Sequence, residues 1–171
     1  MPKTTEHRFL ITLLVALCIS IAPIIYSWPR ASIAEKSSYA QSNEVSAALH
    51  LLRPLAENGD AEAQYRIGQL YEEALEVANS GTNALEWYKQ SAEQGHAHAQ
   101  FSLGRLFVVG HDISQDYVQA YKWFILSESG LPESDTRARA QAAKARETIS
   151  PMMTPAQISK AKKLAASWEP N

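Results

Sequence analysis

The chain has 171 residues, of which 46% are hydrophobic and 20% are charged, a size that allows one ordinary domain or a short repeat array. Its 16 basic and 18 acidic residues give a formal net charge of −2, which argues against a nucleic-acid partner because phosphate binding needs a basic surface. The single cysteine, Cys18, excludes a disulfide framework and a cysteine-ligated zinc or iron–sulfur site. We therefore expect a fold stabilised by packing, without a cofactor.

An apolar segment without charged residues, Phe9 to Tyr26, predicts a transmembrane helix near the amino end. Lys3 and Arg8 precede it, so the positive-inside rule keeps the amino end in the cytoplasm and sends the rest of the chain across the membrane. The segment is longer than most signal-peptide cores and slightly shorter than a full span. Two interpretations of residues 1–30 therefore stay open: a cleaved signal peptide, or a signal anchor that holds the chain on the membrane.

Residues 31–43 read ASIAEKSSYAQSN, a small and polar stretch without helical periodicity. Such a composition is typical of a tether between a membrane segment and a folded domain. We expect a flexible linker here.

A repeat of 36 residues begins after this stretch. Residues 56–65 (AENGDAEAQY) align with residues 92–101 (AEQGHAHAQF), and the same offset continues into a third unit. It aligns alanines and large apolar residues throughout: Ala48, Ala84 and Ala120; Leu51, Trp87 and Trp123; Leu52, Tyr88 and Phe124. The apolar residues inside each unit recur at steps of three and four, so each unit is predicted to be a pair of helices.

The turns between the paired helices are also visible in the sequence. Gly59 and Gly95 stand where the first helix must reverse into the second, and glycine accepts the left-handed conformation that such a turn needs. Asp60 is placed to cap the following helix. We expect the aromatic residues that recur at this offset to form the core between repeats, and the small residues at Gly68 and Gly104 to let neighbouring helices approach closely.

The pattern Gly-x-Ala-x-Ala-Gln, followed by a Leu-Gly-x-Leu-aromatic helix, resembles the Sel-one-like repeat of the tetratricopeptide class. The resemblance covers residues 44–130, in units of about 44–80, 81–116 and a partial 117–130. It implies an all-α fold, a short right-handed α/α solenoid that follows the N-terminal hydrophobic helix. Ala74 stands where the second unit has Gly110, so we expect a longer second helix that runs towards Ala78 in place of the loop.

Residues 131–171 are similar to the helical cap that follows such repeats. A helix is predicted from Thr136 to Thr148, and another after Thr154, where Thr154 and Gln157 form a capping box and Pro155 takes the favoured first position. A cap of this kind covers the open end of the array, because each helix pair buries its apolar face only against a neighbour.

The candidate catalytic and metal-binding residues are few. His96, His98, His111 and Asp112 suggest a metal site, but His96 and His98 are two residues apart and point to opposite sides of a helix. We interpret them as solvent-exposed histidines. The acidic pair Glu72 and Glu73 diverges on its helix, so it is interpreted as a solvated surface instead of an acid–base pair.

The resemblance therefore implies a non-catalytic scaffold or adaptor that binds another protein. The expected location is the bacterial inner membrane, with the folded domain in the periplasm, or the periplasm itself if the N-terminal segment is cleaved. The first helix of each pair lines the concave side in this class. Polar residues of those helices are the candidate partner-binding residues: His50, Arg53, Glu86, Lys89, Gln90 and Lys122. Two alternatives stay open, an envelope enzyme or enzyme activator near peptidoglycan, and a structural subunit of a membrane complex.

Overall fold

The computed structural model describes residues 30–73, 80–110 and 113–171, and it describes side chains from Glu44 onward except those of residues 74–80 and 111–112. The chain divides into two units, Met1–Asn43 and Glu44–Asn171. The packing below is that of the second unit.

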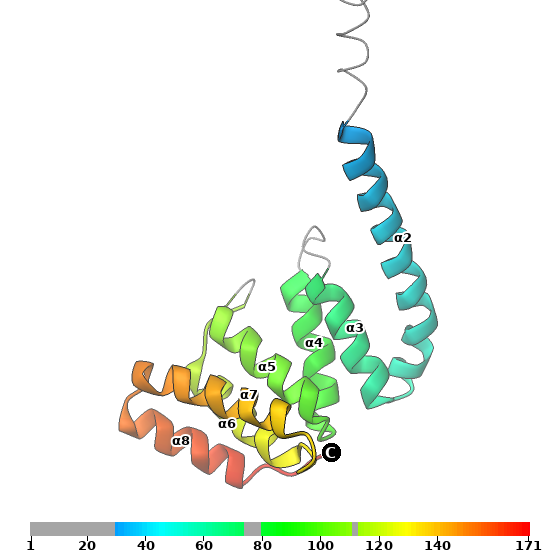
Figure 1. Ribbon diagram of the computed structural model, residues 1–171. Coiled ribbons are helices and arrows are strands. Elements are labelled where there is room, and N and C mark those ends of the chain that lie inside the picture. The colour runs from blue at the N-terminus through cyan, green and yellow to red at the C-terminus, as the bar shows by residue number, and fades with distance from the viewer. Residues whose placement is uncertain (1–29, 74–79, 111–112) are drawn as a thin grey trace, which may run out of the picture. The chain divides into compact units, whose positions relative to one another are not determined.

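The described residues are helical and contain no strand (Figure 1). Three helix pairs and a final helix follow one another: α2 (Arg30–Glu57) with α3 (Ala61–Glu73), α4 (Ser80–Glu93) with α5 (Ala97–Val109), α6 (Tyr117–Gly130) with α7 (Thr136–Ile149), then η1 (Ser150–Met152) and α8 (Pro155–Ala166). The expected all-α fold built from helix pairs is confirmed.

One of our expectations for local structure meets a different outcome. Residues 31–43, expected to be a flexible linker, are helical, because α2 begins at Arg30 and continues without a break into the first repeat. Ala31, Ala34 and Ala40 are too small to form a clear apolar stripe, but alanine has a high helix propensity. The second helix of the first unit is described up to Glu73; the residues towards Ala78 lie outside the described part of the chain, so the longer helix stays a prediction.

The turns inside the first two pairs follow the predicted chemistry. Gly59 and Gly95 adopt φ values of +94° and +88°, the left-handed region that a residue with a side chain rarely enters. Asp60 caps α3, since its Oδ1 accepts a hydrogen bond of 2.7 Å from the backbone N–H of Ala63. The capping box of α8 is present as well, with Thr154 and Gln157 bonding each other's backbone N–H groups.

Successive repeats pack through a contact between a glycine and an aromatic ring. A Cβ atom added at Gly68 would lie 2.5 Å from Cδ1 and Cε1 of Tyr88, and one added at Gly104 would lie 2.7 Å from Cε1 of Phe124. Both rings are buried, with exposed fractions of 0% and 1%. The glycines were expected to bring helix backbones together, and the structure shows that each instead makes room for the ring of the next first helix.

A network of glutamine side chains links the same repeats. Gln64 and Gln100, which are buried and 36 residues apart, donate from Nε2 to the carbonyl oxygens of Ala56 and Ala92 at 3.0 and 3.2 Å. Gln94 Nε2 donates to Gln64 Oε1 at 2.7 Å. Gly130 occupies the position equivalent to Gln94, and Gln100 Oε1 has no hydrogen-bond partner among the described residues.

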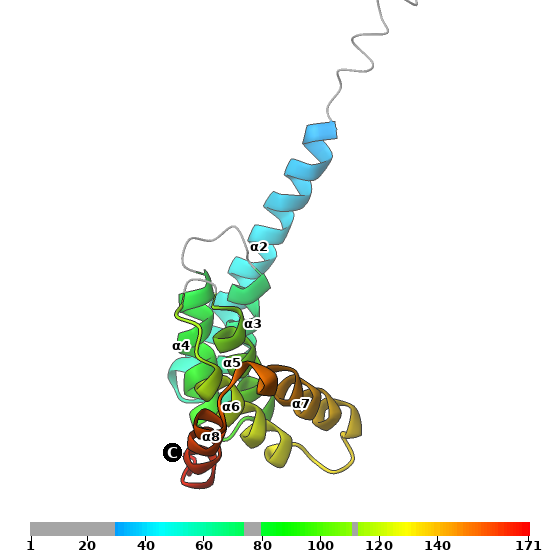
Figure 2. The same ribbon diagram turned by 90° about the vertical axis from the view of Figure 1, so that its left-hand side faces the viewer.

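The last two helices enclose α6, since α7 and α8 each pack against it (Figure 2). Tyr121, Ile149 and Ala161, one residue from each of the three helices, belong to a single apolar cluster. The C-terminal helices therefore cover the end of the array, as the sequence predicts.

No helix in the described part of the chain is long and apolar enough to cross a membrane. The segment Phe9–Tyr26 lies outside the described residues, and the membrane helix predicted there stays a prediction.

Candidate functional site

The candidate binding surface is the face of the first helices that carries the predicted residues. His50 and Arg53 on α2 are exposed, and so are Glu86, Lys89 and Gln90 on α4. Arg53 and Lys89 occupy the same position of successive repeats, 36 residues apart. The structure thus presents five of the six predicted residues to solvent, which is a condition for the role that the sequence assigns them.

The charges on this face form two rows of opposite sign. Arg53 and Lys89 make a basic row, and Glu57 and Glu93, one helical turn further along α2 and α4, make an acidic row. Arg53 makes a long, weak hydrogen bond, in which its Nη2 donates to the hydroxyl of Tyr71 at 3.5 Å. A segment that crosses the two helices would therefore meet cations and carboxylates one turn apart.

Lys122, the sixth predicted residue, has a different environment. Its ammonium nitrogen lies 4.0 Å from the ring centroid of Trp123, in a cation–π arrangement. Burial lowers the pKa of Lys122, and the carboxylate of Glu93 opposes that shift in part. Lys122 is thus partly covered by the protein itself, whereas the other five residues are exposed.

One turn further along, α6 is covered by α8. Lys89 and Gln90 on α4 are exposed, but their equivalents on α6 are the apolar Ile125 and Leu126, and Leu126 is only 8% exposed. Leu126 shares an apolar cluster with Ala165 of α8. The sequence predicts that α8 covers the end of the array, but this contact with α6 was not predicted. The change from Lys89 and Gln90 to two apolar residues is the sequence signal that indicates it.

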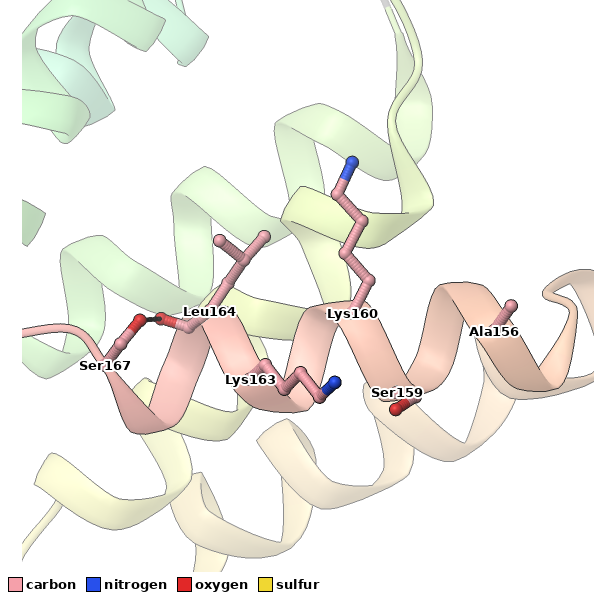
Figure 3. Close-up of a pocket in the computed structure, with 6 residues that line it drawn as sticks. All are labelled: Ala156, Ser159, Lys160, Lys163, Leu164 and Ser167. Carbon is pink, nitrogen blue, oxygen red and sulfur yellow. Dashed lines mark hydrogen bonds between the residues drawn. The ribbon is translucent and has the colours of Figure 1, made fainter.

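The outer side of α8 carries a surface depression of about 510 Å³. Its lining residues come from α8 and from Ser167, the residue that follows it: Ala156, Ser159, Lys160, Lys163, Leu164 and Ser167 (Figure 3). In Figure 3, Lys160 and Leu164 extend to one side of the helix, and Lys163 lies along its near face. Because a single helix cannot surround a small molecule, this depression has the form of a contact surface and lacks that of an enclosed catalytic pocket.

His96 and His98 lie at the start of α5, a second helix. Both were expected to be solvent-exposed, and this is wrong for His96. It is the N-cap of α5: its Nδ1 accepts the backbone N–H of Ala99 at 3.1 Å, and its Nε2 lies 2.9 Å from Glu62 Oε2. Both ring nitrogens are engaged within the fold. His98 is exposed, as expected, and His111 and Asp112 lie outside the described residues.

No group of three or more potential metal ligands is found where the structure describes the chain.

The interpretation of Glu72 as a solvated residue is wrong, because it links two repeats. Its carboxylate accepts hydrogen bonds from the hydroxyl of Tyr88 and from Arg105, each at 2.8 Å. Burial, together with this carboxylate, raises the pKa of the Tyr88 hydroxyl.

The repeated helix pairs and the glycine–aromatic stacking between them define an α/α helical repeat in the described part of the chain. A sequence model of the Sel1 repeat matches residues 61–96 and 97–128. Residues 61–128 are accordingly similar to two Sel1 repeats, as the resemblance of their motifs predicts. Sel1 repeats generally mediate protein–protein interaction and are not catalytic modules.

The fold is similar to that of a solved structure, c5321, a protective antigen present in uropathogenic Escherichia coli strains that displays an SLR fold. The TM-score is 0.60 and the sequences are 24% identical. The alignment covers 79% of this chain and 30% of that chain, so this chain spans less than a third of the length of c5321. No curated protein matches the chain.

Proposed function

We propose that the chain is a protein-interaction module whose α2 and α4 faces bind a peptide segment or a helix of a partner protein. The observation that carries the proposal is the pair of exposed cations, Arg53 and Lys89, at one position of successive repeats, with Glu57 and Glu93 one turn away. A surface that repeats its charges along the array suits an extended or helical segment with the complementary order of charges.

The place of action that we propose is the bacterial cell envelope, with the module on the periplasmic side of the inner membrane. Support comes from the sequence alone, in the apolar segment Phe9–Tyr26 with Lys3 and Arg8 before it. The mass of the protein isolated from membranes tests this part. A retained anchor gives the full 18.9 kDa, whereas a cleaved signal peptide gives a shorter chain.

The binding proposal is tested by charge reversal. The double variant Arg53→Glu with Lys89→Glu should lose the partner that the native chain captures after crosslinking in its host, while its helical circular dichroism stays unchanged. The matched control reverses two exposed cations elsewhere, Lys144→Glu with Lys162→Glu, for the same change in net charge. If both double variants capture the partner equally well, the α2 and α4 faces are not the binding surface.

A further inference from the structure

The residues after α8 return to the first helices. The backbone N–H of Asn171 donates to the carbonyl oxygen of Glu93, at the end of α4, at 2.9 Å. The ring of Trp168 meets that of Trp123 on α6 edge-on, with centroids 6.2 Å apart. A Cβ atom added at Gly95 would lie 3.7 Å from Cβ of Pro170. Residues 168–171 thus connect two neighbouring first helices.

These residues cover an apolar surface of which the preceding repeat has only a part, because Trp87 is the equivalent of Trp123 but Leu126 has no apolar equivalent. Trp123 and Leu126 of α6 are 4% and 8% exposed, and Trp168 packs against the cluster to which both belong. The equivalent of Leu126 on α4 is Gln90, which is polar and exposed. The apolar surface on α6 is therefore matched to a covering aromatic ring.

Residues 168–171 are attached through few contacts and are mostly exposed, as a bound peptide would be and a core element would not. Glu169, Pro170 and Asn171 are exposed, and Trp168 itself is only partly buried. The segment is not helical, and it is attached through one ring and through a backbone hydrogen bond from an exposed residue. Segments with few buried contacts open at a lower free energy than the helices on which they lie.

We propose that the surface formed by Trp123, Leu126 and the turn at Gly95 is a binding site for an extended peptide that carries a tryptophan, and that residues 168–171 fill it from within the chain. A partner segment of the same chemistry takes their place: its indole ring packs on Trp123, and its backbone N–H bonds the carbonyl oxygen of Glu93. The occupant follows from what is seated there, a Trp-Glu-Pro-Asn segment. The site does not depend on the row of Arg53 and Lys89.

The test uses the full chain, purified in detergent, with Trp168→Ala to empty the ring position. The probe is a fluorescent peptide with the sequence of residues 163–171, KLAASWEPN, and the control peptide has alanine in place of its tryptophan. The native chain is the matched control protein, because its own segment competes at the high effective concentration of a tethered ligand. Binding is measured by fluorescence anisotropy.

The expected result is saturable binding of the tryptophan peptide to the Trp168→Ala chain. Binding should be at least tenfold weaker for the alanine peptide, and at least tenfold weaker for the native chain. Equal affinity of the two peptides, equal affinity of the two proteins, or no binding at all would overturn the proposal. Loss of helical circular dichroism in the Trp168→Ala chain would overturn it too, since the ring would then belong to the core and could not be displaced.

Discussion

Alanine at Gly68 tests how the repeats are held together. The added methyl carbon would lie 2.5 Å from two ring carbons of Tyr88, whereas ordinary contacts begin at 3.4 Å, so the ring must retreat by about 0.9 Å. Tyr88 has no room to do so, because it is fully buried and its hydroxyl is bonded to Glu72 at 2.8 Å. Overpacking of this kind costs about 1–3 kcal/mol.

Alanine also has an intrinsic helix propensity about 1 kcal/mol better than glycine, which offsets part of that cost. We therefore expect Gly68→Ala to lower the free energy of unfolding by up to about 2 kcal/mol. Gly130→Ala is the matched control, because its added carbon would make only an ordinary contact, 3.4 Å from Cβ of Ala97. It should leave the stability unchanged or raise it slightly.

The assay is urea denaturation followed by circular dichroism, with a double-mutant cycle that includes Tyr88→Ala. In the Tyr88→Ala background the ring is absent, so Gly68→Ala should no longer destabilise and should instead show the propensity gain. The reasoning is refuted if Gly68→Ala is no more destabilising than Gly130→Ala, or if its cost is the same with and without the ring.

Three further predictions follow from single side chains. Gly130→Gln should stabilise the chain by about 1 kcal/mol in the same assay, because it supplies the donor that Gln100 Oε1 lacks; no gain over Gly130→Ala would count against it. Asp60→Ala should cost about 1 kcal/mol through loss of the cap, and an unchanged denaturation midpoint would contradict this. Burial lowers the pKa of Lys122 in the folded state below its ordinary value near 10.5. The charged lysine therefore lowers the free energy of unfolding at neutral pH, and this loss of stability disappears as the pH rises through the folded pKa towards 10.5. Lys122→Met should remove that rise in stability, and identical pH profiles for the two chains would show that the lysine is not desolvated.

The repeat itself could be predicted from the sequence because its signals are local and periodic. The offset of 36 residues, the turns at Gly59 and Gly95, and the capping box at Thr154 each depend on a few neighbouring residues, and the structure has all of them. Helix pairs and their order follow from such signals with little help from the tertiary structure.

The parts that could not be predicted depend on contacts between distant segments. The partial burial of Lys122 depends on its surroundings in the folded chain, which include the ring of Trp123 and the carboxylate of Glu93, so it was not visible from its position in the repeat. The engagement of His96 requires Glu62, 34 residues earlier, and the engagement of Glu72 requires Arg105, 33 residues later. Single-residue exposure cannot be read from a helical pattern when a neighbouring repeat supplies the partner.

The helix over residues 31–43 was missed for a different reason. Its alternation of small and polar residues has no apolar stripe, and an apolar stripe is the signal that reveals an amphipathic helix. Propensity alone favours helix in such a stretch but is a weak indicator without that stripe.

Site-specific photocrosslinking in the native host tests the proposed interaction surface most directly. A photoreactive amino acid is placed at Lys89, on the first-helix face, or at Arg66, which is also exposed and lies on the second-helix side. Our account predicts one discrete crosslinked product from position 89 and none from position 66. A product from position 66 with none from position 89 would contradict it, and would move the binding surface to the opposite side of the repeats.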